Sequence, residues 1–257
     1  MDRVRARIGD KRVLALVKAF LKSGILGEDR SLRKTDTGTP QGSILSPLLS
    51  NVALSVLDEH IAHGPGGPSS TFHERQRRRR RGLPNYRLIR YADDWCLVVS
   101  GTQADAEMLR EEAAEVLSTM GLRLSPEKTL ITHIDKGPDF LGWRIQRHRK
   151  RGTSKHYIYA YPSRKALAAV MAKVKTQCRK TGTGLPFDAL IICLNQMLRG
   201  WCAYFRPGVS SSTFQYLSSY LWGRVIGWLR RQHARMTWKD LRRRFCGGGW
   251  WPAGEGT

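Results

Sequence analysis

Apolar residues recur with helical spacing at several places along this chain of 257 residues. In residues 10–26 the spacing predicts one amphipathic helix, with Gly24 and Gly27 at its end. Residues 47–61 are rich in apolar side chains and predict a second helix. The glycines and prolines of HGPGGPSS then interrupt regular structure, so we expect a loop over residues 63–84.

Alternation of apolar and polar residues follows this loop and predicts a β-hairpin. Its strands would cover residues 86–91 and 95–100, joined by a turn at Ala92-Asp93-Asp94. Residues 103–120 return to helical spacing. The next segments, LRLSPEKTLITHI and DFLGWRI, have the composition of strands. This part of the chain is therefore expected to mix helices and strands.

The second half of the chain starts with a basic connector, QRHRKRGTSKH, and is then dominated by helical spacing. Two apolar stripes predict two helices there. They consist of Leu190, Leu194, Met197, Leu198, Trp201 and Phe205, and of Phe214, Leu217, Leu221, Val225 and Trp228. We predict an α+β fold in residues 1–150, an all-α region in residues 160–246 and a tail at 247–257, with the boundary near residue 160.

The net charge of the chain limits the classes of partner that it is expected to bind. Lys and Arg total 44 against 21 Asp and Glu, which gives a formal net charge of +23 and a pI of about 10.5. A polyanion is therefore the expected partner, with nucleic acid ahead of an anionic membrane surface. No apolar run approaches the ~20 residues that span a bilayer, and the N-terminus lacks the apolar core of a signal peptide, so we expect a cytoplasmic protein.

Six arginines between Arg75 and Arg81 lie inside the loop expected at residues 63–84. Their mutual repulsion opposes packing and predicts a solvated, mobile excursion that makes electrostatic contacts without sequence preference.

The five cysteines are scattered and form no C-x-x-C pair, which argues against a cysteine metal site or a redox motif.

Asp93 and Asp94 lie side by side between two apolar segments of this basic chain. Adjacent aspartates in a turn ordinarily bond nearby backbone amides, and this is the simplest interpretation of the pair taken alone. Carboxylates raised between two buried strands also concentrate negative charge, which is unfavourable unless a hard cation neutralises it. Mg²⁺ prefers oxygen ligands and completes its shell with water and substrate phosphates, so it is the leading candidate.

The same residues resemble a known family. Tyr91-Ala92-Asp93-Asp94 matches the Y-x-D-D signature of reverse transcriptases, and GTPQGSILSPLLSNVAL resembles the P-Q-G-x-x-x-S-P motif that precedes it. GLRLSPEKT and FLGWRI follow in order, and LNQMLRGWCAYFR and YLSSYLWGRVIGWLRRQH resemble the thumb and maturase segment. Nearly the whole chain thus resembles a group II intron reverse transcriptase/maturase, which implies a partial polymerase palm followed by an all-α thumb and maturase region.

The resemblance implies roles for individual residues. Asp93 and Asp94 would be the catalytic pair and the ligands of Mg²⁺. Pro40, Gln41 and Gly42 would lie beside the template and the nucleotide, where a glycine lets the backbone approach closely. Lys128 would lie near the nucleotide phosphates, or is a solvated surface lysine. Phe140, Leu141 and Gly142 would grip the primer, or Phe140 and Leu141 are an ordinary core pair.

Arginines of the helical half imply contacts with RNA phosphates, and such contacts make affinity fall steeply with salt. They are Arg224, Arg230, Arg231, Arg235, Arg242, Arg243 and Arg244. Four aromatic residues interleaved with this charge could stack on unpaired bases, although core packing is the favoured interpretation for most of them. They are Trp201, Tyr204, Trp222 and Trp228.

Relatives normally supply a third carboxylate from a strand in which Asp is followed by an aromatic pair. Asp2 and Asp10 are the only upstream acids here, and neither has such a pair. The basic finger strands that hold the nucleotide triphosphate in relatives, and a Cys- and His-bearing endonuclease segment, are not recognised either. We therefore expect an N-terminally truncated chain that polymerises poorly by itself, since two-metal catalysis needs ligands on both sides of the ions.

Two functions follow from these observations. The first is RNA-directed DNA polymerisation, in which a DNA primer is extended on intron RNA with Mg²⁺. The second is a splicing cofactor that binds structured intron RNA without catalysis, and a decayed fragment with neither activity is a third possibility. Whether the chain is an enzyme, and its oligomeric state, stay open at the level of sequence.

Overall fold

The computed structural model describes residues 1–22, 25–26, 32–33, 44–182, 184, 186–247 and 249–252. The chain forms two compact units, Met1–Ile131 and Thr132–Thr257. No helix among the described residues is both long enough and apolar enough to cross a membrane. The units are considered one at a time.

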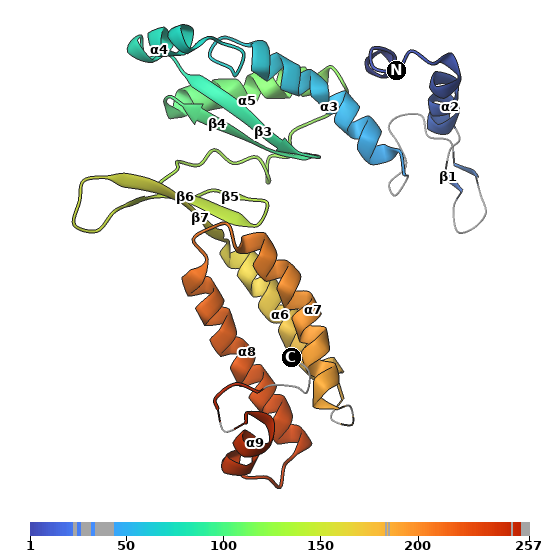
Figure 1. Ribbon diagram of the computed structural model, residues 1–257. Helices are drawn as coiled ribbons and strands as arrows, with labels where there is room; N and C mark the ends of the chain where they lie inside the picture. Colours follow the sequence, from blue (N-terminus) through green and yellow to red (C-terminus); the bar gives the residue numbers. More distant parts are fainter. Residues whose placement is uncertain are drawn as a thin grey trace. The chain divides into compact units, whose positions relative to one another are not determined.

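The first unit contains helices and two antiparallel strand pairs among its described residues (Figure 1). Its elements are α1 (Asp2–Arg5), α2 (Lys11–Lys22), β1 (Ile25–Leu26), β2 (Leu32–Arg33), α3 (Ser46–His63), α4 (Phe72–Arg80), β3 (Asn85–Tyr91), β4 (Asp94–Ser100) and α5 (Gln103–Ser118). β1 pairs with β2, and β3 pairs with β4. The hairpin predicted at residues 86–100 is confirmed, as are the helices predicted on both sides of it.

One apolar core joins α3, α5 and the β3–β4 hairpin. Leu54, Leu57 and Ile61 recur at spacings of three and four on α3. Leu109 and Leu117 lie on the same buried face of α5. Side chains of the hairpin that point to the same side complete the cluster. They are Tyr86, Leu88, Trp95, Leu97 and Val99. The two helices therefore cover one face of the hairpin (Figure 1).

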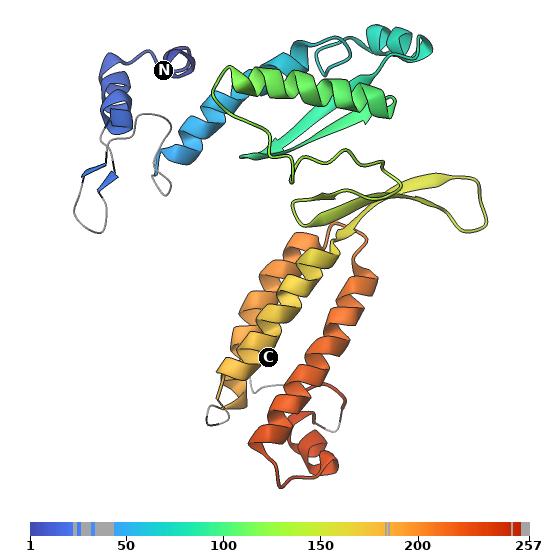
Figure 2. The ribbon, with the colours of Figure 1, turned by 180° about the vertical axis from the view of Figure 1, so that it is seen from behind.

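The second unit consists of a three-stranded antiparallel sheet and a group of helices (Figure 2). Its elements are β5 (Asp139–Phe140), β6 (Trp143–Arg149), β7 (His156–Pro162), α6 (Arg164–Lys180), α7 (Phe187–Phe205), α8 (Ser211–Gln232) and α9 (Trp238–Phe245). The buried side chains of the two predicted stripes, such as Leu190, Leu194 and Trp228, lie in one core with Val174 of α6. Trp228 is fully buried and donates from Nε1 to the carbonyl of Thr181 at 2.9 Å. It is a core residue.

The division between the units precedes the boundary that we expected near residue 160. The sheet β5–β7 is tied to the helices of the second unit. The amide of Ser163 donates to the carbonyl of Gly142 at 2.8 Å, and the amide of Val209 donates to the carbonyl of Ala160 at 2.8 Å. The sheet therefore belongs to the helical unit by its contacts.

Three local predictions were wrong. Phe72–Arg80 is a helix rather than part of a loop, because Thr71 and Glu74 form a capping box at its start. Residues 122–134 form no strand, because a turn at Pro126 directs the amides of Lys128 and Thr129 to the carbonyl of Ser125. The basic connector is instead the paired ends of β6 and β7, with Arg149 opposite His156. Gly24 and Gly27 lie outside the described residues, and the helix before them ends at Lys22.

Candidate active site

The tip of the β3–β4 hairpin presents two carboxylates. Tyr91 pairs with Asp94, so Ala92 and Asp93 form a two-residue turn. Ala92 has φ 53°, a left-handed conformation that is unfavourable for a residue with a Cβ and that concentrates at functional turns. Asp93 and Asp94 are both exposed. The turn therefore holds both carboxylates at the surface on a defined backbone.

Arg90 fastens this turn to α3. Its guanidinium donates from Nε to Asp58 at 2.9 Å, and from Nη1 to the side chain of Asn51 at 2.6 Å and to the carbonyl of Ala92 at 2.8 Å. The side chain is only 14% exposed. The hydrogen bond and charge of Asp58, with a further contribution from the charge of Asp93, raise the pKa of Arg90. Arg90 is thus a fixed cation beneath the turn.

Ser50 of α3 holds Asp93 from the other side. Its hydroxyl donates to Oδ1 of Asp93 at 2.9 Å. Asn51, the next residue, donates from its side chain to the carbonyl of Pro47 at 3.0 Å and accepts from Arg90. The helix that follows the P-Q-G segment therefore supplies partners both to Asp93 and to Arg90.

The donor atoms of this site suit a hard divalent cation. Arg90 spends its hydrogen bonds on Asp58, Asn51 and Ala92, and among the described residues no ion pair neutralises Asp93 or Asp94. Carboxylate oxygens are ligands that Mg²⁺ prefers. Within the described ranges no group of three or more His, Cys, Asp or Glu side chains is placed to hold a metal ion. Asp93 and Asp94 are two carboxylates, fewer than such a group requires.

Two family models match successive parts of the chain, and the first of them includes the Asp93 turn. The family described as reverse transcriptase (RNA-dependent DNA polymerase) matches residues 2–145, which is more than half of the chain. The family described as group II intron, maturase-specific domain matches residues 167–246. The chain belongs to the group II intron reverse transcriptase/maturase family. The resemblance inferred from the sequence and the α+β fold class are both confirmed.

Curated relatives agree with this family. "Protein YkfC" of Escherichia coli is 33% identical over 195 residues, 68% of this chain and 51% of the relative. "Group II intron-encoded protein LtrA" of Lactococcus lactis is 30% identical over 196 residues, 59% of this chain and 32% of the relative. The "Uncharacterized 91 kDa protein in cob intron" of Schizosaccharomyces pombe is 28% identical, covering 78% of this chain and 31% of the relative. The chain thus spans about half the length of the first relative and about a third of the others.

The other residues that the resemblance assigned to a polymerase site are considered one group at a time. Pro40, Gln41 and Gly42 lie outside the described residues. Lys128 lies in the same unit as Asp93, exposed in the turn after Pro126. No hydrogen bond or ion pair of its side chain is present among the described residues.

The predicted primer grip is a tight turn in the second unit. Phe140 pairs with Trp143, and between them Leu141 and Gly142 have φ 50° and 81°. The hydroxyl of Tyr204 donates to the carbonyl of Leu141 at 2.8 Å. A Cβ on Gly142 would lie 3.4 Å from the ring of Phe205. The turn is therefore fixed on α7 and has little freedom of its own.

The arginines predicted to bind RNA divide into two groups. Some support the fold: Arg231 donates to the carbonyl of Cys178 at 3.3 Å, and Arg242 donates to the carbonyl of Gly249 at 2.8 Å. Arg224 lies over the ring of Tyr220 at 4.9 Å. Arg231 is exposed as well. The other exposed members are Arg230, Arg235, Arg243 and Arg244, of which Arg230 lies over the ring of Trp238 at 5.8 Å and Arg244 over the ring of Phe245 at 5.3 Å. These four carry charge that remains available to a polyanion.

Sequence reasoning missed several residues that shape these sites. Ser50, Asn51 and Asp58 were not singled out, although they lie within or just beyond the P-Q-G segment. A face of the β6–β7 hairpin was missed as well. It carries Tyr157, Tyr159 and Tyr161 opposite His148, with ring centroids of His148 and Tyr159 5.8 Å apart. Alternating tyrosines in HYIYAYP were the available signal.

Proposed function

We propose that this chain carries the palm and maturase parts of an RNA-directed DNA polymerase that extends a DNA primer on intron RNA. The observation that carries the proposal is the Asp93 turn: two exposed carboxylates on a hairpin that Arg90 and Ser50 fasten to α3. Members of the family generally use a divalent metal. We assign Mg²⁺, because both donors are carboxylate oxygens and the substrate brings phosphates.

Asp93 and Asp94 would hold the metal, with Ser50 orienting the carboxylate of Asp93. A metal held there would supply Lewis-acid stabilisation of the negative charge that develops as the primer hydroxyl displaces pyrophosphate from the nucleotide. Arg90 contributes by fixing the turn, because its donors are already committed to Asp58, Asn51 and the carbonyl of Ala92. Two carboxylates supply only part of a two-metal centre, so we expect weak extension from these ligands alone.

A primer-extension assay with Mg²⁺ on an RNA template tests this proposal. Asp93→Ala and Asp93→Asn should both abolish incorporation, because the amide keeps the shape of the side chain and removes its charge. Glu111→Gln removes an equally exposed carboxylate from α5 and should leave incorporation unchanged. Equal incorporation by Asp93→Ala and the unaltered chain would rule out the metal assignment.

The second unit favours an additional role in binding intron RNA. Between Asp139 and Asp188 the sequence contains twelve Lys and Arg residues and no Asp or Glu. Several of them, including Lys150 and Arg151, lie at the tip of the β6–β7 hairpin beside the exposed ring of Tyr157. Such a surface attracts phosphates and offers an aromatic ring to unpaired bases. A maturase could use it without polymerising DNA.

A salt titration tests the binding role separately from catalysis. Affinity for a structured intron RNA should fall steeply as salt rises, because each neutralised phosphate releases counterions. Lys150→Gln combined with Arg151→Gln should make the dependence shallower by about two in slope. A flat response of the unaltered chain to salt would contradict binding through phosphates.

A further inference from the structure

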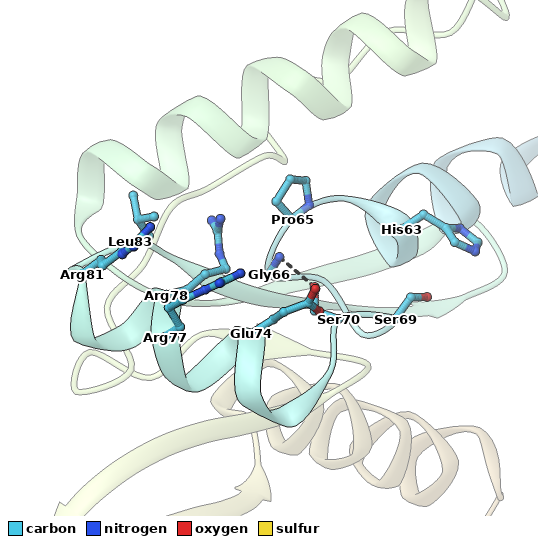
Figure 3. Close-up of a pocket in the computed structure, with 10 residues that line it drawn as sticks. All are labelled: His63, Pro65, Gly66, Ser69, Ser70, Glu74, Arg77, Arg78, Arg81 and Leu83. Atoms are coloured by element: carbon cyan, nitrogen blue, oxygen red, sulfur yellow. Dashed lines mark hydrogen bonds between the residues drawn. The ribbon is translucent and has the colours of Figure 1, made fainter.

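A basic cavity lies at the end of α3 that is remote from the Asp93 turn. Its volume is about 530 Å³, and its walls come from the end of α3, the following loop and α4 (Figure 3). The polar side chains that line it include His63, Ser69, Ser70, Arg77, Arg78 and Arg81. Ser50 and His63 are 13 residues apart on one helix, which corresponds to about 20 Å. The cavity is therefore separate from the candidate active site.

Two arginines of the predicted mobile run fix the chain around this cavity. Arg75 donates to the carbonyl of Ser70 at 2.7 Å, and Arg78, which lines the cavity, donates from Nε to the carbonyl of Pro84 at 3.0 Å. The loop that precedes α4 is closely packed. Gly66 has φ 90°, and a Cβ there would lie 2.6 Å from the carbonyl oxygen of Pro84. The cavity thus has a defined shape.

The cavity also carries uncompensated positive charge. Glu74 is the only acid in its lining, and its carboxylate accepts from the amide of Thr71 at 2.8 Å and from the hydroxyl of Thr71 at 3.0 Å. These hydrogen bonds lower the pKa of Glu74 and commit it to the helix cap. The charge of Arg77 also lowers the pKa of Glu74, but among the described residues neither Arg77 nor Arg81 forms a hydrogen bond or ion pair through its side chain. Both are exposed.

We propose that this cavity binds a phosphate group of an RNA backbone through Arg77 and Arg81. The two positions are four residues apart, so their guanidinium groups emerge on one side of α4 and can donate to the same anion. Ser69 and Ser70 also line the cavity; the hydroxyl of Ser70 accepts from the amide of Gly66 at 3.0 Å, and both hydroxyls can donate to a ribose (Figure 3). Because the cavity opens to solvent and exceeds the size of a single phosphate, a continuous strand fits it.

This site deepens the proposed nucleic-acid role of the chain, and it adds an RNA contact at a place that the family motifs do not reach. It needs neither a metal nor the Asp93 turn. The same chemistry could be satisfied by free phosphate or pyrophosphate. The experiment must therefore separate a phosphate in a strand from a free one.

The matched variants come from one helix. Arg77→Gln combined with Arg81→Gln removes two charges from the lining of the cavity. Arg79→Gln combined with Arg80→Gln removes two charges from the same run at positions that do not line it. Glutamine has a helix propensity close to that of arginine, so α4 should persist in both, as circular dichroism can verify. Only the position of the lost charge then differs.

Fluorescence anisotropy of a short labelled RNA, measured on the whole chain without Mg²⁺ or nucleotides, gives the readout. The Arg77/Arg81 pair should weaken binding about tenfold or more, and the Arg79/Arg80 pair should weaken it less than about threefold. Equal losses would overturn the proposal in favour of diffuse attraction by the whole run. Ser69→Ala should weaken binding to RNA more than binding to DNA of the same sequence, and equal losses would exclude the ribose contact.

Competition with inorganic pyrophosphate distinguishes a phosphate in an RNA strand from a free one. Weak competition supports a backbone phosphate, whereas tight pyrophosphate binding that depends on Arg77 and Arg81, without an effect on RNA, would overturn it. This RNA affinity is measured without Mg²⁺ or nucleotides, so it does not depend on incorporation at the Asp93 turn. The cavity and the polymerase proposal can therefore fail independently.

Discussion

The hydroxyl of Ser50 donates a hydrogen bond of 2.9 Å to Oδ1 of Asp93 and joins α3 to the tip of the β3–β4 hairpin. The two residues are 43 positions apart in the chain. The helix that follows the P-Q-G segment thus touches the Y-x-D-D turn directly, and the two motifs form one structure.

Ser50→Ala should slow primer extension without unfolding the protein. Loss of one exposed hydrogen bond corresponds to about 1 kcal/mol, or roughly a fivefold change in rate if the bond orients Asp93 during the reaction. The rate of single-nucleotide incorporation checks this, with Ser50→Thr as the control that keeps a hydroxyl. If Ser50→Ala and Ser50→Thr extend primers at the rate of the unaltered chain, the hydrogen bond has no part in orienting Asp93.

Arg90→Ala should destabilise the first unit by about 1–3 kcal/mol, because Asp58, Asn51 and the carbonyl of Ala92 lose their donor together. Arg90→Lys should recover only part of this loss, since an ammonium group cannot reproduce the fork of a guanidinium. Urea unfolding monitored within residues 1–131 measures both variants. Equal stability of Arg90→Ala and the unaltered chain would contradict the role of Arg90 as a fastener.

Gly142→Ala should destabilise the second unit by about 1–2 kcal/mol. The residue has φ 81°, which disfavours any Cβ, whereas the new methyl group would lie in ordinary contact with the ring of Phe205. Thermal unfolding measures the loss. Gly152→Ala is the matched control for the left-handed conformation alone, because its φ is 73° and nothing lies within 4 Å of its Cβ position. The two losses should be similar, and no loss at either position would contradict the cost assigned to the left-handed conformation.

The capping box of α4 should respond to acid. Hydrogen bonds from Thr71 lower the pKa of Glu74 below its usual 4.5, so the carboxylate is favoured in the folded state. Its stabilising contribution is therefore complete above pH 4.5 and is lost as the pH falls through the lower folded-state pKa. The difference in melting temperature between the unaltered chain and Glu74→Ala should shrink over this range. A difference that grows on acidification would show that the sign is wrong.

Local pattern predicted the hairpin and the helices, because periods of two and of 3.6 are properties of the chain itself. It missed α4 because repulsion among arginines was weighed without the Thr71–Glu74 cap or the carbonyls that Arg75 and Arg78 reach. Charged residues in β6 and β7 concealed a strand pair in the same way. Basic residues were treated as solvated until their partners were known.

The candidate site was predictable in part. Asp93 and Asp94 were identified because they are adjacent and follow a recognisable motif. The partners that hold them were not, since Asp58 is 32 residues from Arg90 and no local pattern joins the two. Sequence motifs identified the two aspartates, whereas the residues that hold them in place became apparent only in the folded structure.

The phase of α3 constrains how its sequence can vary. One extra residue between Ser50 and Asp58 would rotate the later part of the helix by about 100°, which would carry Asp58 away from Arg90 and Ile61 out of the apolar cluster. Insertions in α3 should therefore be tolerated only before Ser46 or after His63. The length of α3 is also fixed. A nucleic-acid strand that touched both ends of this helix would therefore have its two contact points at a fixed distance from each other.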